Sequence, residues 1–242
     1  MTDLPSERPR ANGRFPSSPL RRSHQTIELA VFLFLVLPAM LLPAPAQRLM
    51  HAGFYGVVVN VAFRDLALLI LVLYFVWRNR EPLALVGWGS ARPWAEIGLG
   101  LALFVPFFLG AAGLASVLSR AGLSAPHHIP SFLAAKNTGE LVLAGLLALI
   151  VAIAEETIFR GYLILRFRAF ASPAVSVALS TGIFALGHGY EGAAGVLTVA
   201  AMGLVFAALY LWRKSLIAPM TLHFLQDFVA LVLVPLLGKK LL

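Results

Sequence analysis

Among the ionisable side chains of the C-terminal half, six stand well inside apolar segments of the chain. They are Glu155, Glu156, Arg160, His188, His223 and Asp227. A charge at the centre of a bilayer costs roughly 2.5–3.5 kcal/mol on insertion scales, so such residues are retained where they pair, line water or do chemistry. Carboxylates and imidazoles beside water can take a proton from it and return the proton to a leaving group. The group therefore predicts a hydrolytic site within the membrane.

Helix spacing separates the roles of the first three residues. Glu156 and Arg160 are four residues apart and share a helix face, so they can form an ion pair that lowers the cost of burying both. Glu155 is turned by about 100° from Glu156, and Phe159 stands where its i+4 cation would be. A desolvated carboxylate without a cationic partner is a stronger base than one in water. Glu155 is therefore the candidate general base.

The same spacing recurs in two later segments. His223 and Asp227 share a helix face, where they can act together or orient one another, and Phe184 and His188 place an aromatic ring beside an imidazole. Each residue alone has an ordinary structural explanation, such as a hydrogen bond at a helix end. Two carboxylates and two histidines on three helices of one apolar region favour a functional site.

The sequence leaves the question of a metal open. A catalytic zinc ion takes three protein ligands and a water, and His188, His223 and Glu155 could supply them. The chain contains no cysteine, so a thiolate ligand and a cysteine nucleophile are excluded. Either zinc or no cofactor is compatible with these residues.

The composition predicts that helices in a membrane position these side chains. The chain is 60% hydrophobic and 12% charged, against about 25% charged residues in soluble domains. Spans of about 20 apolar residues predict an all-α, polytopic membrane helix bundle of about seven transmembrane helices, with six to eight as the range. The predicted spans lie near residues 27–45, 55–77, 94–118, 139–164, 173–189, 193–212 and 216–237.

Three regions are expected along the chain. Residues 1–25 are rich in Pro, Ser and Arg and predict a disordered cytoplasmic tail. Residues 26–138 would hold the N-terminal membrane helices and a loop, and residues 139–242 the helical core with the candidate site. The run from Leu29 to Ala44-Pro45-Ala46 also imitates a cleavable signal peptide, although the long preceding tail and the prolines within the run argue against cleavage.

The distribution of basic residues predicts that the N-terminus lies inside. Thirteen basic residues then fall on the cytoplasmic side and five outside, so the net charge of +8 reflects topology rather than binding to nucleic acid. The inner residues are Arg8, Arg10, Arg14, Arg21, Arg22, Arg78, Arg80, Arg92, Arg160, Arg166, Arg168, Arg213 and Lys214. The outer residues are Arg48, Arg120, Lys136, Lys239 and Lys240, and the last two leave an eighth crossing or a re-entrant segment open.

Other charged residues at the ends of or within predicted spans have simpler explanations. Glu28, Glu96 and Glu140 each open a predicted span, where a carboxylate favours the positive end of the helix dipole. Arg64 and Asp65 lie inside the second span, and adjacent helical residues do not face each other. We therefore expect each to have a partner elsewhere in the bundle, such as Asn60 for Arg64, with contact to a substrate as the alternative.

Three motifs carry a resemblance to a known family. Residues 155–160 match the pattern EExxxR, residues 184–188 match FxxxH, and residues 223–227 match HxxxN/D. With these motifs in order over about residues 139–237, the sequence resembles the CAAX-protease and bacteriocin-processing intramembrane endopeptidases, also called Abi proteins, which include the type II CAAX prenyl endopeptidases. The first three predicted spans carry no signature of this family.

The resemblance implies hydrolysis of a peptide bond of a membrane-associated protein or peptide, in a cavity open to the cytosol. It implies that Glu155 and His188 activate the water, that His223 and Asp227 stabilise the oxyanion, and that the Glu156–Arg160 pair holds the helix. It also leaves a metalloprotease and a glutamate protease as alternatives, and a prenylated substrate undecided.

One departure from the family pattern concerns the third motif. The prenyl endopeptidases favour Asn where this chain has Asp227, and an ionised carboxylate would repel an oxyanion. Asp227 must then be protonated, orient His223 or bind a metal.

Two other functions remain as alternatives. Buried carboxylates and histidines also mark ion pathways, as in a proton-coupled transporter, but that reading predicts broken helices or repeats in both halves of the chain. A non-catalytic membrane scaffold or immunity protein would keep the same motifs for stability. We expect an integral membrane protein in contact with lipid. Its size and its resemblance to this family favour a bacterial cytoplasmic membrane, and the sequence leaves its oligomeric state undetermined.

Overall fold

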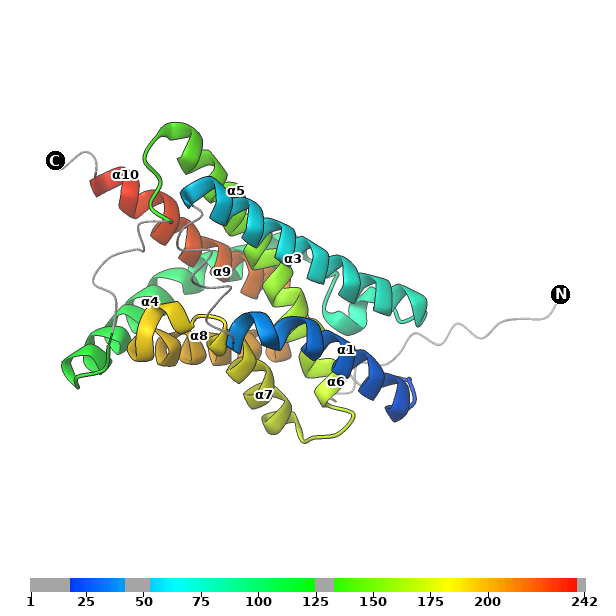
Figure 1. The fold of residues 1–242 in the computed structure, drawn as a ribbon. Coiled ribbons are helices and arrows are strands. Elements are labelled where there is room, and N and C mark those ends of the chain that lie inside the picture. The colour runs from blue at the N-terminus through cyan, green and yellow to red at the C-terminus, as the bar shows by residue number, and fades with distance from the viewer. Residues whose placement is uncertain (1–17, 42–52, 125–132, 239–242) are drawn as a thin grey trace.

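The chain folds into an all-helical bundle (Figure 1), which confirms the predicted fold class. The structure, a computed structural model, describes residues 18–41, 53–124 and 133–238, and within these ranges it contains no strand. The elements are α1 (Arg22–Leu41), α3 (Gly53–Arg78), η1 (Leu83–Val86), α4 (Pro93–Arg120), α5 (Thr138–Glu155), η2 (Glu156–Leu163), α6 (Ile164–Phe167), α7 (Pro173–Leu186), η3 (Gly189–Glu191), α8 (Gly192–Arg213), α9 (Ile217–Phe228), η4 (Val229–Leu233) and α10 (Val234–Gly238). Of the η elements, η2 and η4 are π-helices and the other two are 3₁₀-helices.

The helices coincide with the seven predicted spans. Within the described residues five segments are long and apolar enough to cross a membrane, namely 53–78, 93–120, 138–167, 189–213 and 217–237, while α7 is apolar but has only 14 residues. Helix α1 begins at Arg22, inside the segment predicted as a tail. Residues 1–17, the end of the first predicted span with Ala44-Pro45-Ala46, and the terminal Lys239 and Lys240 lie outside the described residues.

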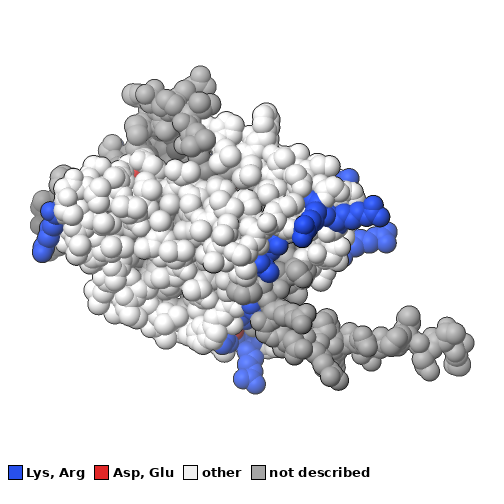
Figure 2. Space-filling model, turned by 90° about the horizontal axis from the view of Figure 1, so that it is seen from below, with Lys and Arg blue, Asp and Glu red and all other residues white. Residues whose placement is uncertain are grey.

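The surface has the pattern of a membrane protein. In the view of Figure 2, Lys and Arg gather at the ends of the molecule and a broad uncharged band separates them. Trp77, Trp94 and Trp212 are largely exposed, and each lies within two residues of an arginine at a helix end. Tryptophan is enriched where helices leave the hydrocarbon for the headgroup layer. The chain is therefore an integral membrane protein.

The continuous helix formed by α5, η2 and α6 runs through the middle of the bundle. Helix α5 packs between α3 and α9, and η2 contacts α7, α3 and η1. All eight residues of η2 are buried. The first candidate motif, which spans the junction of α5 and η2, is thereby placed in the core of the bundle.

The π-helix η2 is a feature that regular helix spacing does not predict. Its i→i+5 bonding widens the turn and displaces backbone groups from their usual partners. The Ser180 hydroxyl on α7 donates a hydrogen bond to the carbonyl of Phe159. Thr157 donates to the carbonyl of Ile153 at 2.7 Å and accepts from the Trp88 indole at 3.0 Å. Neighbouring elements thus stabilise the widened turn directly after Glu155.

A buried ionic network fastens the N-terminal helices to the end of the central helix. The Arg166 guanidinium is fully buried and donates to Glu81 at 3.0 and 2.6 Å and to Glu28 at 3.1 Å. Asn79 also donates to Glu28, at 2.6 Å. Burial of these charges is tolerable because each has a partner. Arg166 therefore belongs to the protein interior rather than to the surface charge that sets topology.

The helix-start reading of the three glutamates is wrong for one of them. Glu96 and Glu140 lie in the first turns of α4 and α5, as predicted. Glu28 lies beyond the first turn of α1, and it is buried as an acceptor for Arg166 and Asn79. The apolar pattern alone did not show that α1 begins at Arg22, six residues before Glu28.

Replacement of Gly161 by alanine is expected to destabilise the bundle. A Cβ at Gly161 would collide with the backbone carbonyl of Val86 in η1, which cannot rotate away as a side chain could. Overpacking of this kind costs about 1–3 kcal/mol, so the thermal unfolding midpoint in detergent should fall. Gly98→Ala is the matched control, because nothing lies within 4 Å of its added Cβ and alanine favours a helix. Equal midpoints for the two variants would contradict the close crossing of η1 and η2.

Candidate active site

Glu155 ends α5 as a buried carboxylate that forms no hydrogen bond within the described residues. Its Oε1 lies 3.8 Å from Nη2 of Arg64, and its Oε2 lies 3.9 Å from Nε2 of His223. Both distances exceed that of a hydrogen bond. A buried acceptor without a partner is costly unless something binds there. Glu155 is thus available to a water molecule or a proton.

His223 on α9 is held by its other ring nitrogen. The Nδ1 of His223 donates to Oε1 of Glu156 at 2.8 Å. The Nε2 faces Glu155 and also lies 3.5 Å from Oδ2 of Asp227. Because the partner of one ring nitrogen fixes the role of the other, Glu156 directs Nε2 of His223 toward the two remaining carboxylates.

The predicted ion pair between Glu156 and Arg160 is confirmed. Nη1 of Arg160 donates to Oε1 of Glu156 at 2.9 Å, and both side chains are buried. The Arg160 guanidinium lies 4.1 Å from the ring centroid of Phe184 and 5.0 Å from that of Phe206. One oxygen of Glu156 therefore accepts from both a cation and an imidazole, a double role that helix spacing did not reveal.

His188 joins the cluster through Phe184. Its Nδ1 donates to the Phe184 carbonyl at 3.0 Å, and the two rings lie 4.9 Å apart. The Phe184 ring also contacts the ring of His223 at 6.1 Å. Within the described residues no hydrogen bond or ion pair links His188 directly to Glu155 or His223. Helix α7 is about 21 Å long, shorter than the ~30 Å hydrocarbon core, and the ring contacts of Phe184 with both histidines keep His188 near the other motif residues.

The zinc site that the sequence left open does not fit this arrangement. Within residues 18–41, 53–124 and 133–238, no group of three or more His, Cys, Asp or Glu side chains has the geometry to hold a metal ion. His188, His223 and Glu155 are therefore not gathered as one ligand set.

Arg64 and Asp65 of α3 lie beside this site, where contact with a substrate was the alternative to packing in the bundle, and the expectations that Asn60 is the partner of Arg64 and that the two neighbours do not bond each other were wrong. Nε of Arg64 donates to Oδ1 of Asp65 at 2.8 Å, because the long guanidinium side chain reaches back to its neighbour. Its Nη2 lies 3.8 Å from Oε1 of Glu155, so the candidate general base has a cation nearby, contrary to the expectation from its own helix. The signal in the sequence was the presence of two charges within an apolar span.

The three motifs of the C-terminal half thus meet in one buried cluster. Residues 137–229 match the family model described as Type II CAAX prenyl endopeptidase Rce1-like. The match covers more than a third of the chain and includes all seven candidate residues of the motifs. No curated protein and no solved structure showed a significant match. We refer to residues 137–229 as the Rce1-like domain.

The match bears on activity at a coarse level. It implies an intramembrane endopeptidase, in agreement with the apolar helices of the structure. The domain begins just before α5 and ends within η4. Helix α3, which brings Arg64 and Asp65 to Glu155, lies outside it.

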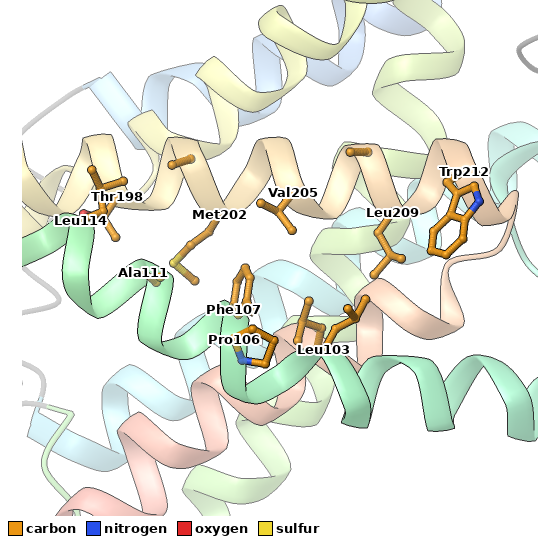
Figure 3. A pocket seen from close by; sticks show the side chains of 14 residues that line it. Leu103, Pro106, Phe107, Ala111, Leu114, Thr198, Met202, Val205, Leu209 and Trp212 are labelled. Atoms are coloured by element: carbon orange, nitrogen blue, oxygen red, sulfur yellow. The ribbon is translucent and has the colours of Figure 1, made fainter.

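An apolar groove of about 540 Å³ lies between α4 and α8, beside the Rce1-like domain (Figure 3). Phe107, Met202 and Leu209 point into it from the two helices. Leu222, the residue before His223, also lines it. The Phe107 ring contacts Phe206 at 5.1 Å, and Phe206 stacks on His223 at the same distance. The groove is therefore separated from the imidazole by one aromatic layer.

The two neighbouring glutamates of the Rce1-like domain are expected to differ in their effect on stability. Glu156→Gln leaves the buried Arg160 without its counter-charge, and loss of one partner of a buried pair costs about 3–5 kcal/mol. Glu155→Gln removes a buried charge that has no hydrogen bond, so its stability should equal or exceed that of the wild type. Thermal unfolding of both variants in the same detergent measures the difference. A larger loss for Glu155→Gln would mean that the structural and functional roles are assigned the wrong way round.

Proposed function

We propose that this protein is an endopeptidase that hydrolyses a peptide bond of a membrane-associated protein or peptide, with Glu155 as the general base. The observation that carries the proposal is the buried Oε2 of Glu155, which has no hydrogen-bond partner among the residues that the structure describes and lies 3.9 Å from Nε2 of His223. A water molecule within hydrogen-bond reach of both atoms would be held and polarised at once.

The reaction then proceeds by general base and general acid catalysis. Glu155 takes a proton from the water, and the hydroxide oxygen forms a bond to the carbonyl carbon of the substrate. The carbonyl oxygen carries the negative charge of the tetrahedral intermediate. The C–N bond breaks as the charge returns to the carbonyl, and Glu155 passes its proton to the leaving nitrogen. One water is thereby divided between the new carboxylate and the new amine.

The other motif residues support this water. His188 presents Nε2 as a further acceptor, since its Nδ1 donates to the Phe184 carbonyl. Asp227 lies 3.5 Å from Nε2 of His223, which favours an orienting role for its carboxylate over direct stabilisation of an oxyanion. Glu156 and Arg160 hold His223 and the wide turn in place.

The substrate is proposed to enter from the membrane. The groove between α4 and α8 is lined by apolar side chains and reaches Leu222, next to His223. An apolar part of a substrate that arrives from lipid would exchange contacts with lipid tails for van der Waals packing against these side chains. The description of the family names a prenyl endopeptidase, so a prenylated peptide is one form of substrate to test.

We further propose that the N-terminus lies on the cytoplasmic side of a bacterial cytoplasmic membrane. The excess of basic residues in segments 1–25 and 78–93, together with Arg168, Arg213 and Lys214, supports this orientation. The cleavage site would then be open to the cytosol.

Digestion of a membrane-protein peptide library tests the proposed function. The purified protein in lipid nanodiscs is incubated with the library in H₂¹⁸O, and new C-termini are identified by mass spectrometry. We expect cleavage with one ¹⁸O in each new carboxylate, and a loss of about 10²–10⁴-fold in rate for Glu155→Gln. Glu140→Gln changes a carboxylate at the other end of α5 and serves as the matched control with normal cleavage.

Two further arms sharpen the result. A strong zinc chelator is expected to leave cleavage unchanged, whereas a loss restored by zinc would overturn the metal-free role of Glu155. Paired prenylated and unprenylated forms of each cleaved peptide show whether the lipid contributes to kcat/KM. Equal cleavage by wild type and Glu155→Gln would reject Glu155 as the base, and no cleavage by the wild type would favour the scaffold or transporter alternatives.

A further inference from the structure

We propose that Arg64 of α3, outside the Rce1-like domain, is a catalytic residue whose guanidinium stabilises the oxyanion of the tetrahedral intermediate. This inference rests on the proposed peptidase function and assigns to it a group from the N-terminal half of the chain. Oxyanion stabilisation requires N–H donors aimed at the position where negative charge develops. A side chain near Glu155 can take this role only if it has N–H groups that do not already donate to another acceptor.

The other N–H donors of the cluster are either engaged or enclosed by protein. Nδ1 of His223 donates to Glu156, and Nδ1 of His188 donates to the Phe184 carbonyl. Nη1 of Arg160 donates to Glu156, and its Nη2 has no hydrogen-bond partner within the described residues, but the guanidinium is almost completely buried against the Phe184 and Phe206 rings. None of these groups can turn to a substrate without breaking a contact that holds the site together.

Arg64 differs from them in both bonding and exposure. Its Nε is the atom that bonds Asp65, which leaves the terminal nitrogens for another acceptor. Its side chain is 44% exposed, although Arg64 lies near the middle of the span 53–78. A guanidinium at that depth is tolerable where it meets water or a polar ligand rather than lipid. Arg64 is therefore a cation at the edge of the site. Asp65 holds its Nε, and its Nη2 lies on the side of Glu155.

The distance between Arg64 and Glu155 suits a shared reacting group. Nη2 of Arg64 lies 3.8 Å from Oε1 of Glu155, too far for a hydrogen bond between them. A carbonyl whose carbon is attacked by a water on Glu155 can place its oxygen near Arg64. Asp65 is almost completely buried and holds the guanidinium on that side.

The charge balance of the cluster also requires this cation. Four carboxylates belong to it, and the guanidiniums of Arg64 and Arg160 face them. The carboxylates are Asp65, Glu155, Glu156 and Asp227. A developing oxyanion adds a further negative charge, which an ionised Asp227 would oppose. Arg64 supplies the opposite charge that an asparagine amide at residue 227 would have supplied as a dipole.

Steady-state kinetics of Arg64 variants test the inference, with a fluorescence-quenched peptide whose cleavage by the wild type is established in the library digestion. Arg64→Gln should lower kcat by about 10²–10³-fold, the usual effect of losing one oxyanion donor, with KM within about threefold of the wild type. Arg64→Lys keeps a charged donor and should retain intermediate activity. Guanidinium ion at a non-denaturing concentration should restore part of the activity of Arg64→Gln but not of Glu155→Gln.

Arg78→Gln is the matched control, because Arg78 is an exposed arginine at the end of the same helix. Its kcat and KM should match those of the wild type. Full activity of Arg64→Gln, or a rise in KM with unchanged kcat, would overturn the inference while leaving the peptidase function intact. Equal loss in Arg64→Gln and Arg64→Lys, without rescue by guanidinium, would assign Arg64 a structural role and also overturn it. Absence of cleavage by the wild type would overturn both proposals.

Discussion

The double hydrogen bond to one oxygen of Glu156 is the interaction on which the candidate site depends. Oε1 of this buried carboxylate accepts from Nη1 of Arg160 and from Nδ1 of His223. Charge-assisted bonds of this kind are roughly twice as strong as neutral ones, and in the interior of a membrane bundle they lack competition from water. The carboxylate thereby joins η2 to α9 and directs the free edge of His223 toward Glu155.

The two adjacent glutamates are distinguished by their surroundings rather than by their chemistry. Glu156 accepts hydrogen bonds from Arg160 and His223, whereas Glu155 accepts none within the described part of the chain and has charged groups at 3.8 and 3.9 Å. The π-helix η2 begins between them, and a second π-helix, η4, begins two residues after Asp227. Wide turns of this type often occur at functional sites because they re-aim side chains without ending the helix. A widened helical turn and a carboxylate without a hydrogen bond within the described residues therefore coincide at the proposed centre of chemistry.

The N-terminal helices contribute to the site although the Rce1-like domain does not include them. Helix α3 places Arg64 and Asp65 beside Glu155, and the network of Arg166 with Glu28 and Glu81 fastens α1 and the end of α3 to α6. A cluster of four carboxylates would repel itself without such cations. The recognisable motifs thus form only part of the electrostatic environment.

The sequence by itself determined the helical fold class, the approximate spans and the membership of the motif cluster. It could do so because apolar runs of membrane length have one stable backbone solution and because residues four apart share a helix face, as the Glu156–Arg160 bond illustrates. Only the tertiary structure decided that His223 bonds Glu156, that Arg64 bends back to Asp65 and approaches Glu155, and that Glu28 is buried against Arg166. Contacts between distant helices depend on crossing geometry and on the reach of long side chains, and neither is encoded in the periodicity of a single segment.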